Sequence, residues 1–223
     1  MNATKPVKAI TFDVGGTLIR PWPSVGHVYA EVAARHGIKV SPAVLNRRFA
    51  AAWRELKSFN HTRGEWAALV DQTFAGQEGN PPSETFFSEL YERFSEPEAW
   101  RVFEDALPAL DALAALGLDL GIISNWDERL RPLLDRLGLG KYFETIIISC
   151  EVGFSKPSPV IFEQAVRKLG LAPQSILHVG DSFTSDVEGA RAAGFQALQI
   201  TRGRGDIREG QIKSLRELEG VAL

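Results

Sequence analysis

Six polar side chains of this 223-residue chain occur directly after short apolar runs, or in a loop behind such a run: Asp13, Ser124, Asn125, Lys156, Asp181 and Asp186. Three carboxylates drawn within about 5 Å would repel one another by roughly 3 kcal/mol per pair at an effective dielectric of about 20. A hard divalent cation removes that repulsion, and Mg²⁺ typically takes one or two carboxylates together with water and substrate phosphate. The lysine and the hydroxyl would bind a phosphate dianion, and an aspartate can itself be the nucleophile. Such a set could perform metal-assisted phosphoryl transfer.

Each of these residues also has a purely structural interpretation. Asp13 could cap a turn, Ser124 could cap the helix that follows it, and Asp186 could favour the positive end of a helix. Lys156, in the loop GFSKPSP, would ordinarily be a solvated cation. Taken singly, the structural interpretation is favoured for all of them except Asp13. The functional interpretation depends on their meeting at one place.

The elements that would bring them together alternate between strands and helices from about residue 105 onward. Apolar, β-branched runs predict strands at Val7–Asp13, Leu118–Ser124 and Ser175–Asp181, and more weakly at Thr145–Ser149 and Gln196–Thr201. Helical patterns lie between them at Asp127–Leu137, Pro157–Leu169 and Thr184–Ala193. This alternation predicts an α/β fold with an open, doubly wound parallel sheet, in which ligands bind outside the carboxyl ends of the strands.

The stretch from Pro21 to about Glu104 interrupts this alternation. It offers no convincing strand, and glycines punctuate its helical patterns. Helices are predicted at Gly26–His36, Pro42–Ser58, Arg63–Ala75 and Ser83–Phe94. We therefore expect two domains: an α/β core formed by residues 1–20 and 104–223, and a helical domain, residues 21–103, inserted after the first strand.

Composition and charge exclude several classes of protein. Hydrophobic residues make up 44% of the chain, as in ordinary globular proteins. Lys and Arg number 25 against 28 Asp and Glu, a net charge of −3, so no basic field would attract nucleic acid. The apolar run near the amino terminus is too short for a signal peptide or a membrane span. A single cysteine, Cys150, excludes an intramolecular disulfide or a Cys-rich zinc site. We expect a cytoplasmic protein without nucleic-acid or membrane partners and with a buried Cys150; the sequence does not determine its oligomeric state.

Four segments, in order, resemble the motifs of the haloacid dehalogenase superfamily of hydrolases: FDVGGTL (12–18), ISN (123–125), KPSPVIF (156–162) and GDSFTSD (180–186). As a set these motifs are highly specific, and the resemblance covers essentially the whole chain. The helical insertion after the first motif is similar to the α-helical cap of that superfamily, and the stretches 24–40 and 123–130 are similar to one of its branches. The resemblance implies a Rossmann-like catalytic core with a helical cap.

The resemblance also implies a role for each matching residue. Asp13 would be the nucleophile, and Thr17 would support the loop that carries it. Ser124 and Asn125 would bind the phosphoryl oxygens. Lys156 would neutralise the attacking carboxylate and the phosphoryl charge. The substrate would be a small phosphorylated molecule.

A Mg²⁺ cofactor is implied by the same resemblance. Asp13 would ligate the metal, Asp181 would do so directly or through water, and Asp186 would ligate it or hold its hydration shell. The backbone carbonyl of Gly15 would complete the set. Phosphatases of the superfamily carry a second Asp at this position, as a general acid and base. Such groups contribute about 10²- to 10⁴-fold, so its loss is a large deficit for alkyl phosphates and a small one for acyl or aryl phosphates.

Gly15 leaves alternatives to a phosphatase open. One is a weakly active or non-catalytic protein with a binding or regulatory role. Another is a haloacid dehalogenase, since those enzymes also lack the second Asp. Their last motif, however, has Ser-Ser-Asn in place of GDS and uses no metal, whereas this chain keeps Gly180–Ser182 and both downstream acids. Phosphoryl transfer is the favoured interpretation.

Three further features lie outside these motif assignments. Trp126, directly after Asn125, could line the substrate pocket or pack against the cap. His178, inside an apolar strand, is expected to be a core histidine with satisfied hydrogen bonds. The loop RGRGDIR at residues 202–208 is expected to be solvated despite its three arginines.

Overall fold

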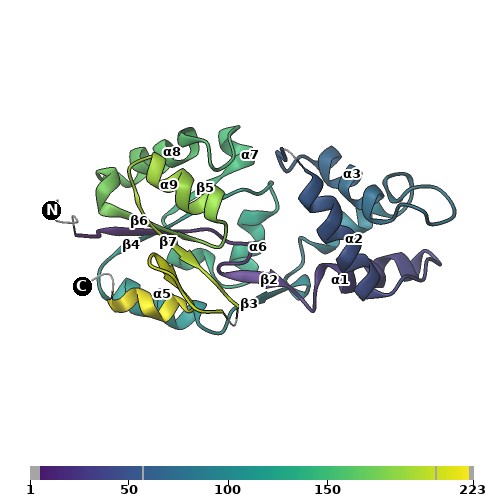
Figure 1. Cartoon of the computed structure of the whole chain (residues 1–223), viewed down its shortest axis with the longest axis horizontal. Coiled ribbons are helices and arrows are strands. Elements are labelled where there is room, and N and C mark those ends of the chain that lie inside the picture. Colours follow the sequence, from purple (N-terminus) through teal and green to yellow (C-terminus); the bar gives the residue numbers. More distant parts are fainter. Residues whose placement is uncertain (1–5, 57, 204, 221–223) are drawn as a thin grey trace. The chain divides into compact units, whose positions relative to one another are not determined.

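A six-stranded parallel sheet forms the centre of the larger of two compact units in this computed structural model (Figure 1). The structure describes residues 6–56, 58–203 and 205–220. The larger unit contains the described residues up to Ile19 and from Val102 onward, and the second contains those of Arg20–Arg101. The strand order is β5–β4–β1–β6–β7–β8, and each neighbouring pair is parallel. The strands are β1 (Ala9–Phe12), β4 (Asp119–Ser124), β5 (Thr145–Ile148), β6 (Ile176–Gly180), β7 (Gln196–Ile200) and β8 (Gln211–Ile212).

Continuous burial explains why the central runs form strands. All four residues of β1 and all five of β6 are buried, as expected for a parallel sheet covered on both faces. The α/β fold and the five predicted strands are confirmed. β8 has only two residues, which is too short to leave a pattern in the sequence.

β1 is the point at which the strand order reverses. Its neighbours are β4 on one side and β6 on the other, so successive connections run in opposite directions from it. Phe12 is paired with Ile122 in β4 and with Val179 in β6. The carboxyl ends of the three central strands therefore lie side by side, at the kind of switch point where open α/β sheets bind ligands.

Helices cover both faces of this sheet. α8 (Pro159–Leu169) and α9 (Gly189–Ala192) lie on one face, and α5 (Ala106–Ala115) lies on the other (Figure 1). Side chains of α8 and α9 pack with Ala9, Ile123 and Ile176 in one apolar cluster. Two shorter helices, α6 (Leu130–Arg136) and α7 (Ser149–Val152), follow β4 and β5.

Two helices differ from their predictions at the amino end. α6 begins at Leu130 rather than Asp127, because the buried Asp127 carboxylate accepts hydrogen bonds from the backbone N–H (3.1 Å) and Nε (2.8 Å) of Arg129. The helix predicted over Thr184–Ala193 begins as a π-helical segment, Phe183–Glu188, before α9. Wide turns of this kind occur often at functional sites.

The second unit is helical and has its own apolar core. Ser24, Ser41 and Thr62 cap its first three helices, each accepting a hydrogen bond from the N–H three residues ahead. Tyr29 packs against three phenylalanine rings within the core. No helix described in either unit combines the length and apolar character needed to cross a bilayer. The α-helices of this unit are α1 (Val25–Arg35), α2 (Pro42–Glu55), α3 (Arg63–Thr73) and α4 (Phe87–Arg93).

The sequence does not predict the two-stranded sheet formed by β2 (Ile19–Pro21) and β3 (Trp100–Val102). Beside it, the N–H of Trp22 donates to the carbonyl of Ala99 at 2.8 Å, so the helical segment begins and ends at one place. Strands of three residues that pair across a whole helical segment leave no local periodicity, which is why the expectation of a strandless stretch is wrong at its ends.

Candidate active site

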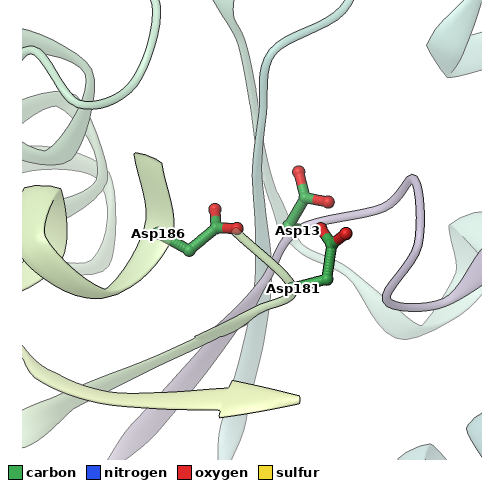
Figure 2. A group of neighbouring side chains, drawn as sticks. All are labelled: Asp13, Asp181 and Asp186. Atoms are coloured by element: carbon green, nitrogen blue, oxygen red, sulfur yellow. The ribbon is translucent and has the colours of Figure 1, made fainter. Parts of the chain in front are cut away.

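Three carboxylates meet beyond the carboxyl ends of β1 and β6 (Figure 2). Asp13 directly follows β1, Asp181 directly follows β6, and Asp186 lies in the π-helical segment. One oxygen atom of each lies within 4.8 Å of those of the other two. Asp13 and Asp186 are buried, whereas Asp181 is exposed. The strand ends thus bring together the acids that the sequence groups by pattern.

The buried ammonium group of Lys156 lies between two of these carboxylates. Its Nζ donates hydrogen bonds to Oδ1 of Asp13 (2.8 Å), to Oδ1 of Asp186 (2.5 Å) and to the carbonyl of Ile123 (2.7 Å), so all three protons have acceptors. Burial by itself lowers the pKa of an ammonium group, but the charges of Asp13 and Asp186 outweigh it and raise the pKa of Lys156. Lys156 is therefore a cation within the site.

Asn125 fixes the loop that carries this lysine. Its Oδ1 accepts a hydrogen bond from the backbone N–H of Lys156 at 2.7 Å, and its Nδ2 donates to the Lys156 carbonyl at 3.0 Å. The peptide bond between Lys156 and Pro157 is cis. Both polar atoms of the Asn125 side chain thus bind the main chain of Lys156, a positioning role that its place beside Ser124 in the sequence does not reveal.

Asp13 has one constrained oxygen and one open oxygen. Its Oδ1 accepts hydrogen bonds from Nζ of Lys156 and from Oγ of Ser124, the latter at 3.0 Å. Ser124 is buried, at 1% exposure. Within the described part of the chain no hydrogen bond reaches Oδ2. Two donors on one oxygen orient the carboxylate and leave Oδ2 available to an electrophile or a metal.

The three acids differ in proton affinity. Burial raises the pKa of Asp13, the charge of Lys156 partly offsets that rise, and Asp186 adds to it. Partial desolvation, followed by the charges of Asp13 and Asp186, raises the pKa of the exposed Asp181 to about 7. Burial would raise the pKa of Asp186 as well, but Lys156 and His178 outweigh it and hold that pKa well below its usual value. One lysine against three carboxylates leaves the site short of positive charge.

His178, in β6, contacts and orients Asp186. It is fully buried in β6, with Nδ1 at 2.9 Å from Oγ1 of Thr11 and Nε2 at 3.2 Å from Oδ1 of Asp186. Burial lowers its pKa, so the ring is neutral at neutral pH. The prediction of a satisfied core histidine is confirmed. Its contact with Thr11 depends on the pairing of Thr11 with His178 across β1 and β6, which the sequence pattern does not show.

Two glycines make room for the carboxylates. Gly16 has a φ of 84°, and a Cβ there would lie 2.5 Å from Oδ2 of Asp181. A Cβ on Gly180 would overlap the carboxyl group of Asp186. Glycine at these positions is therefore a steric requirement of the acid cluster.

The loop after β1 is held by an arginine from the far end of the sequence. Thr17 is fully buried, and its Oγ1 has no hydrogen-bond partner among the residues that the structure describes. Its carbonyl accepts a hydrogen bond from Nη2 of Arg202, whose Nη1 donates to both carboxylate oxygens of Asp105 at 2.7 and 2.8 Å. The expectation of a solvated loop is wrong for Arg202, because these acceptors bind it. Arg208 is exposed, as expected, and Arg204 lies outside the described residues.

Gly15 faces the indole of Trp126. A Cβ on Gly15 would lie 3.2 Å from Cζ3 of that ring. The main chain of Trp126 is fixed by Ser149, whose Oγ accepts from the Trp126 N–H at 3.0 Å and donates to its carbonyl at 3.1 Å. Trp126 therefore packs on the first loop of the larger unit.

Cys150 is exposed at the start of α7, so the expectation of a buried cysteine is wrong. Cys150 follows β5, which ends at Ile148, and lies in the first turn of the short helix α7. Partial desolvation and then the nearby carboxylates, Glu151 first, raise the pKa of the thiol. A raised pKa means that the thiol is not activated as a nucleophile.

The acid cluster fits a hard divalent cation, because its donors are all oxygen atoms that converge on one place. Oδ2 of Asp13 is open, and Asp181 is exposed. Both oxygens of Asp186 already accept hydrogen bonds, Oδ1 from Lys156 and Oδ2 from the N–H of Ser182 at 2.9 Å. Asp13 and Asp181 therefore suit direct ligands, and Asp186 suits a ligand reached through water.

Comparison with known proteins identifies the family of this chain. A family model described as haloacid dehalogenase-like hydrolase matches residues 7–194. The chain is 33% identical over 211 residues to haloacid dehalogenase-like hydrolase domain-containing protein 3 of Danio rerio, covering 90% of this chain and 87% of that protein. It is 30% identical over 214 residues to glyceraldehyde 3-phosphate phosphatase of Methanopyrus kandleri, covering 89% and 85%. The crystal structure of a HAD phosphatase from Thermococcus onnurineus is 28% identical, with a TM-score of 0.71 and coverage of 96% and 97%. The chain belongs to the haloacid dehalogenase-like hydrolase family.

Proposed function

We propose that this hydrolase is a Mg²⁺-dependent phosphatase that acts on a small phosphorylated metabolite through an aspartyl-phosphate on Asp13. The observation that carries the proposal is the Asp13 carboxylate, with Oδ1 bound by Lys156 and Ser124, Oδ2 open, and two further acids beside it. A relative named glyceraldehyde 3-phosphate phosphatase supports a phosphate monoester as the class of substrate.

The residues that would hold the metal are Asp13, Asp181 and Asp186, with the Gly15 carbonyl as a further ligand. Bound Mg²⁺ would neutralise charge on the phosphoryl oxygens and on the surrounding carboxylates. Lys156 supplies a second positive charge that is always present, 2.8 Å from Asp13. Because His178 and Ser182 hold Asp186 in place, the site is ordered before a metal binds.

Asp13 would act as the nucleophile through Oδ2. A bond from this oxygen to phosphorus forms while the bond from phosphorus to the leaving oxygen breaks, giving an acyl phosphate. Ser124 and Lys156 would bind the phosphoryl group, and Thr17 would support the nucleophile's loop. Asn125 would bind it through the second proton of Nδ2, since the first is donated to the Lys156 carbonyl. Water then displaces Asp13 from phosphorus, which releases inorganic phosphate and restores the carboxylate.

The helical segment, residues 21–103, would serve as a cap over the substrate, and residues 1–20 and 104–223 as the catalytic core. Closing caps exclude water and select substrates. A chain whose net charge is −3 has no basic field to attract nucleic acid, so we propose no nucleic-acid partner. We place the protein in the cytoplasm.

A panel of phosphorylated metabolites, assayed with Mg²⁺ and with EDTA, tests the proposal. We expect turnover with Mg²⁺, none with EDTA, and none from Asp13→Asn, which removes the anionic nucleophile at nearly constant shape. Asp119→Asn, at an exposed residue at the amino end of β4, is the matched control and should retain activity. Turnover by Asp13→Asn would remove the proposal. Metal-independent halide release from a haloacid would indicate a dehalogenase, and a protein that neither turns over nor binds Mg²⁺ would indicate a binding role.

A further inference from the structure

We propose that Trp126 fills the place in which a general acid would act, and that it restricts the enzyme to substrates whose leaving groups depart as stable anions, namely acyl and aryl phosphates. This inference rests on the proposed function, because it concerns the leaving group of the same reaction. It adds that the edge of an indole ring lies against the position of the missing acid.

Trp126 packs closely on Gly15. A Cβ on Gly15 would lie 3.2 Å from Cζ3 and 3.9 Å from Cη2 of the indole, and the first distance is shorter than ordinary contact between carbon atoms, about 3.5–4.0 Å. The outer edge of the indole is therefore in tight contact with the point at which any side chain at residue 15 must begin. We expect a carboxyl group at residue 15 to compete with the ring edge for this space.

The backbone of Trp126 is fixed by hydrogen bonds on both sides. Ser149, which is 3% exposed, binds both the N–H and the carbonyl of Trp126, and the N–H of Cys150 donates to the same carbonyl at 3.3 Å. On the preceding side, Asn125 is bonded twice to Lys156. The residue that carries the indole is thus held between the lysine loop and α7, two residues from the Ser124 that contacts Asp13.

The indole edge offers no proton to the leaving group of the proposed reaction. When Oδ2 of Asp13 bonds to phosphorus, the breaking P–O bond leaves its electron pair on the leaving oxygen. An acid at residue 15 would supply a proton to that oxygen, whereas the Cζ3 and Cη2 edge of an indole carries only C–H groups. A carboxylate or a phenolate departs without a proton and an alkoxide does not, so the Gly15–Trp126 pair selects by leaving-group pKa.

A series of aryl phosphates of increasing leaving-group pKa, extended by glycerol phosphate, tests this selection through kcat/KM. In the natural protein we expect kcat/KM to fall steeply along the series. Gly15→Asp alone should leave the slope unchanged, because the new carboxyl group meets the indole. The double change Gly15→Asp with Trp126→Ala should flatten the slope and raise turnover of glycerol phosphate by about 10²-fold. Tyr142→Ala is the matched control, because it truncates an aromatic side chain in the short helical turn (Gly140–Tyr142) before the amino end of β5, whereas the site lies at the carboxyl ends of the strands.

A binding measurement gives a readout that does not depend on turnover. Calorimetry should show that Trp126→Ala weakens the binding of phenylphosphonate by roughly three- to tenfold, the range for one aromatic pair. The binding of methylphosphonate should stay unchanged. Equal weakening of both would show that Trp126 is merely structural and would overturn the inference.

Two kinetic outcomes would also overturn the inference. One is a kcat/KM of the natural protein that does not change with leaving-group pKa. The other is a double variant whose slope equals that of Gly15→Asp alone, whether both slopes are steep or both are flat. The failure of this inference is separable from that of the proposed function. Turnover by Asp13→Asn removes the proposed function, whereas an inactive Asp13→Asn combined with a flat slope removes only the role of Trp126.

Discussion

One buried cation organises the site at the scale of single residues. Lys156 is 4% exposed, and each of its three ammonium protons has an oxygen acceptor. Two of those acceptors, on Asp13 and Asp186, are carboxylates that are themselves buried. Removing one partner of a buried ionic group leaves uncompensated charge in a medium that solvates it poorly.

Lys156→Met is therefore expected to lower the free energy of unfolding by about 3–5 kcal/mol, measured by urea denaturation. Added Mg²⁺ should recover part of this loss, because it neutralises the same carboxylates. Lys168→Met, which removes an exposed lysine of α8, is the control and should change stability by less than about 0.5 kcal/mol. Equal, small effects of the two changes would contradict the arrangement.

The raised pKa of Asp181, about 7, makes Mg²⁺ binding depend on pH. A metal needs the ionised carboxylate, so below about pH 7 a proton must leave Asp181 first, and the affinity should fall by up to roughly tenfold per pH unit. Above that pH the dependence should level off. Calorimetry between about pH 6 and pH 8 measures this, and Asp181→Asn should bind more weakly and lose the step. An affinity that is constant, or that rises as the pH falls, would count against Asp181 as a ligand.

At the scale of elements, the strands that are buried along their length are the ones that the sequence predicts best. β1 and β6 are buried along their whole length, so each appears in the sequence as a mostly apolar run, broken only by Thr11 in β1 and His178 in β6. Asp13 and Asp181 could be predicted as site residues because each directly follows such a run. β2, β3 and β8 have two or three residues each and depend on partners distant in the sequence, so no local pattern marks them.

Contacts between elements could not be predicted in the same way. The bonds from Asn125 to Lys156 join residues 31 positions apart in the chain. The bond between Thr11 and His178 depends on β1 and β6 being neighbours and on their register. Arg202 shows the same limit, because its acceptor Asp105 lies almost a hundred residues earlier in the chain. The residue types were visible in the sequence, but the pairing came from the tertiary fold.

Arg202→Ala is expected to destabilise the protein by about 1–3 kcal/mol, because it removes the bonds to Asp105 and to the carbonyl of Thr17. Burial alone would raise the pKa of Asp105, but hydrogen bonds from Arg202, Leu215 and Ser214 outweigh it and hold that pKa below its usual value. A lowered carboxylate pKa contributes stability above the unfolded value, about 3.9, and this contribution is lost as the pH falls through the folded value.

The cost of Arg202→Ala should therefore be greatest near neutral pH and should shrink below about pH 4, as measured by urea denaturation across that range. Arg208→Ala removes an exposed arginine from the same loop and is the matched control. A cost for Arg202→Ala that does not vary with pH, or that equals the cost for Arg208→Ala, would show that the contact with Asp105 does not stabilise the fold.

At the scale of the whole molecule, the described residues form two units, each with its own apolar core. The acid cluster and Lys156 belong entirely to the larger unit. The proposed chemistry is therefore built on the parallel sheet. Substrate identity could not be predicted from the sequence, because it depends on the shape of a surface rather than on periodicity or on motif residues.

The central claim is that Asp13 itself carries the phosphoryl group during turnover. Acid quenching of the Mg²⁺-loaded enzyme during turnover of an aryl phosphate, followed by peptide mass spectrometry, tests it most directly. We predict a peptide heavier by one phosphoryl group, with the modification on Asp13, and its absence from Asp13→Asn and from samples treated with EDTA. Active enzyme that releases phosphate while this peptide stays unmodified, or that carries the phosphoryl group on another residue, would contradict the account.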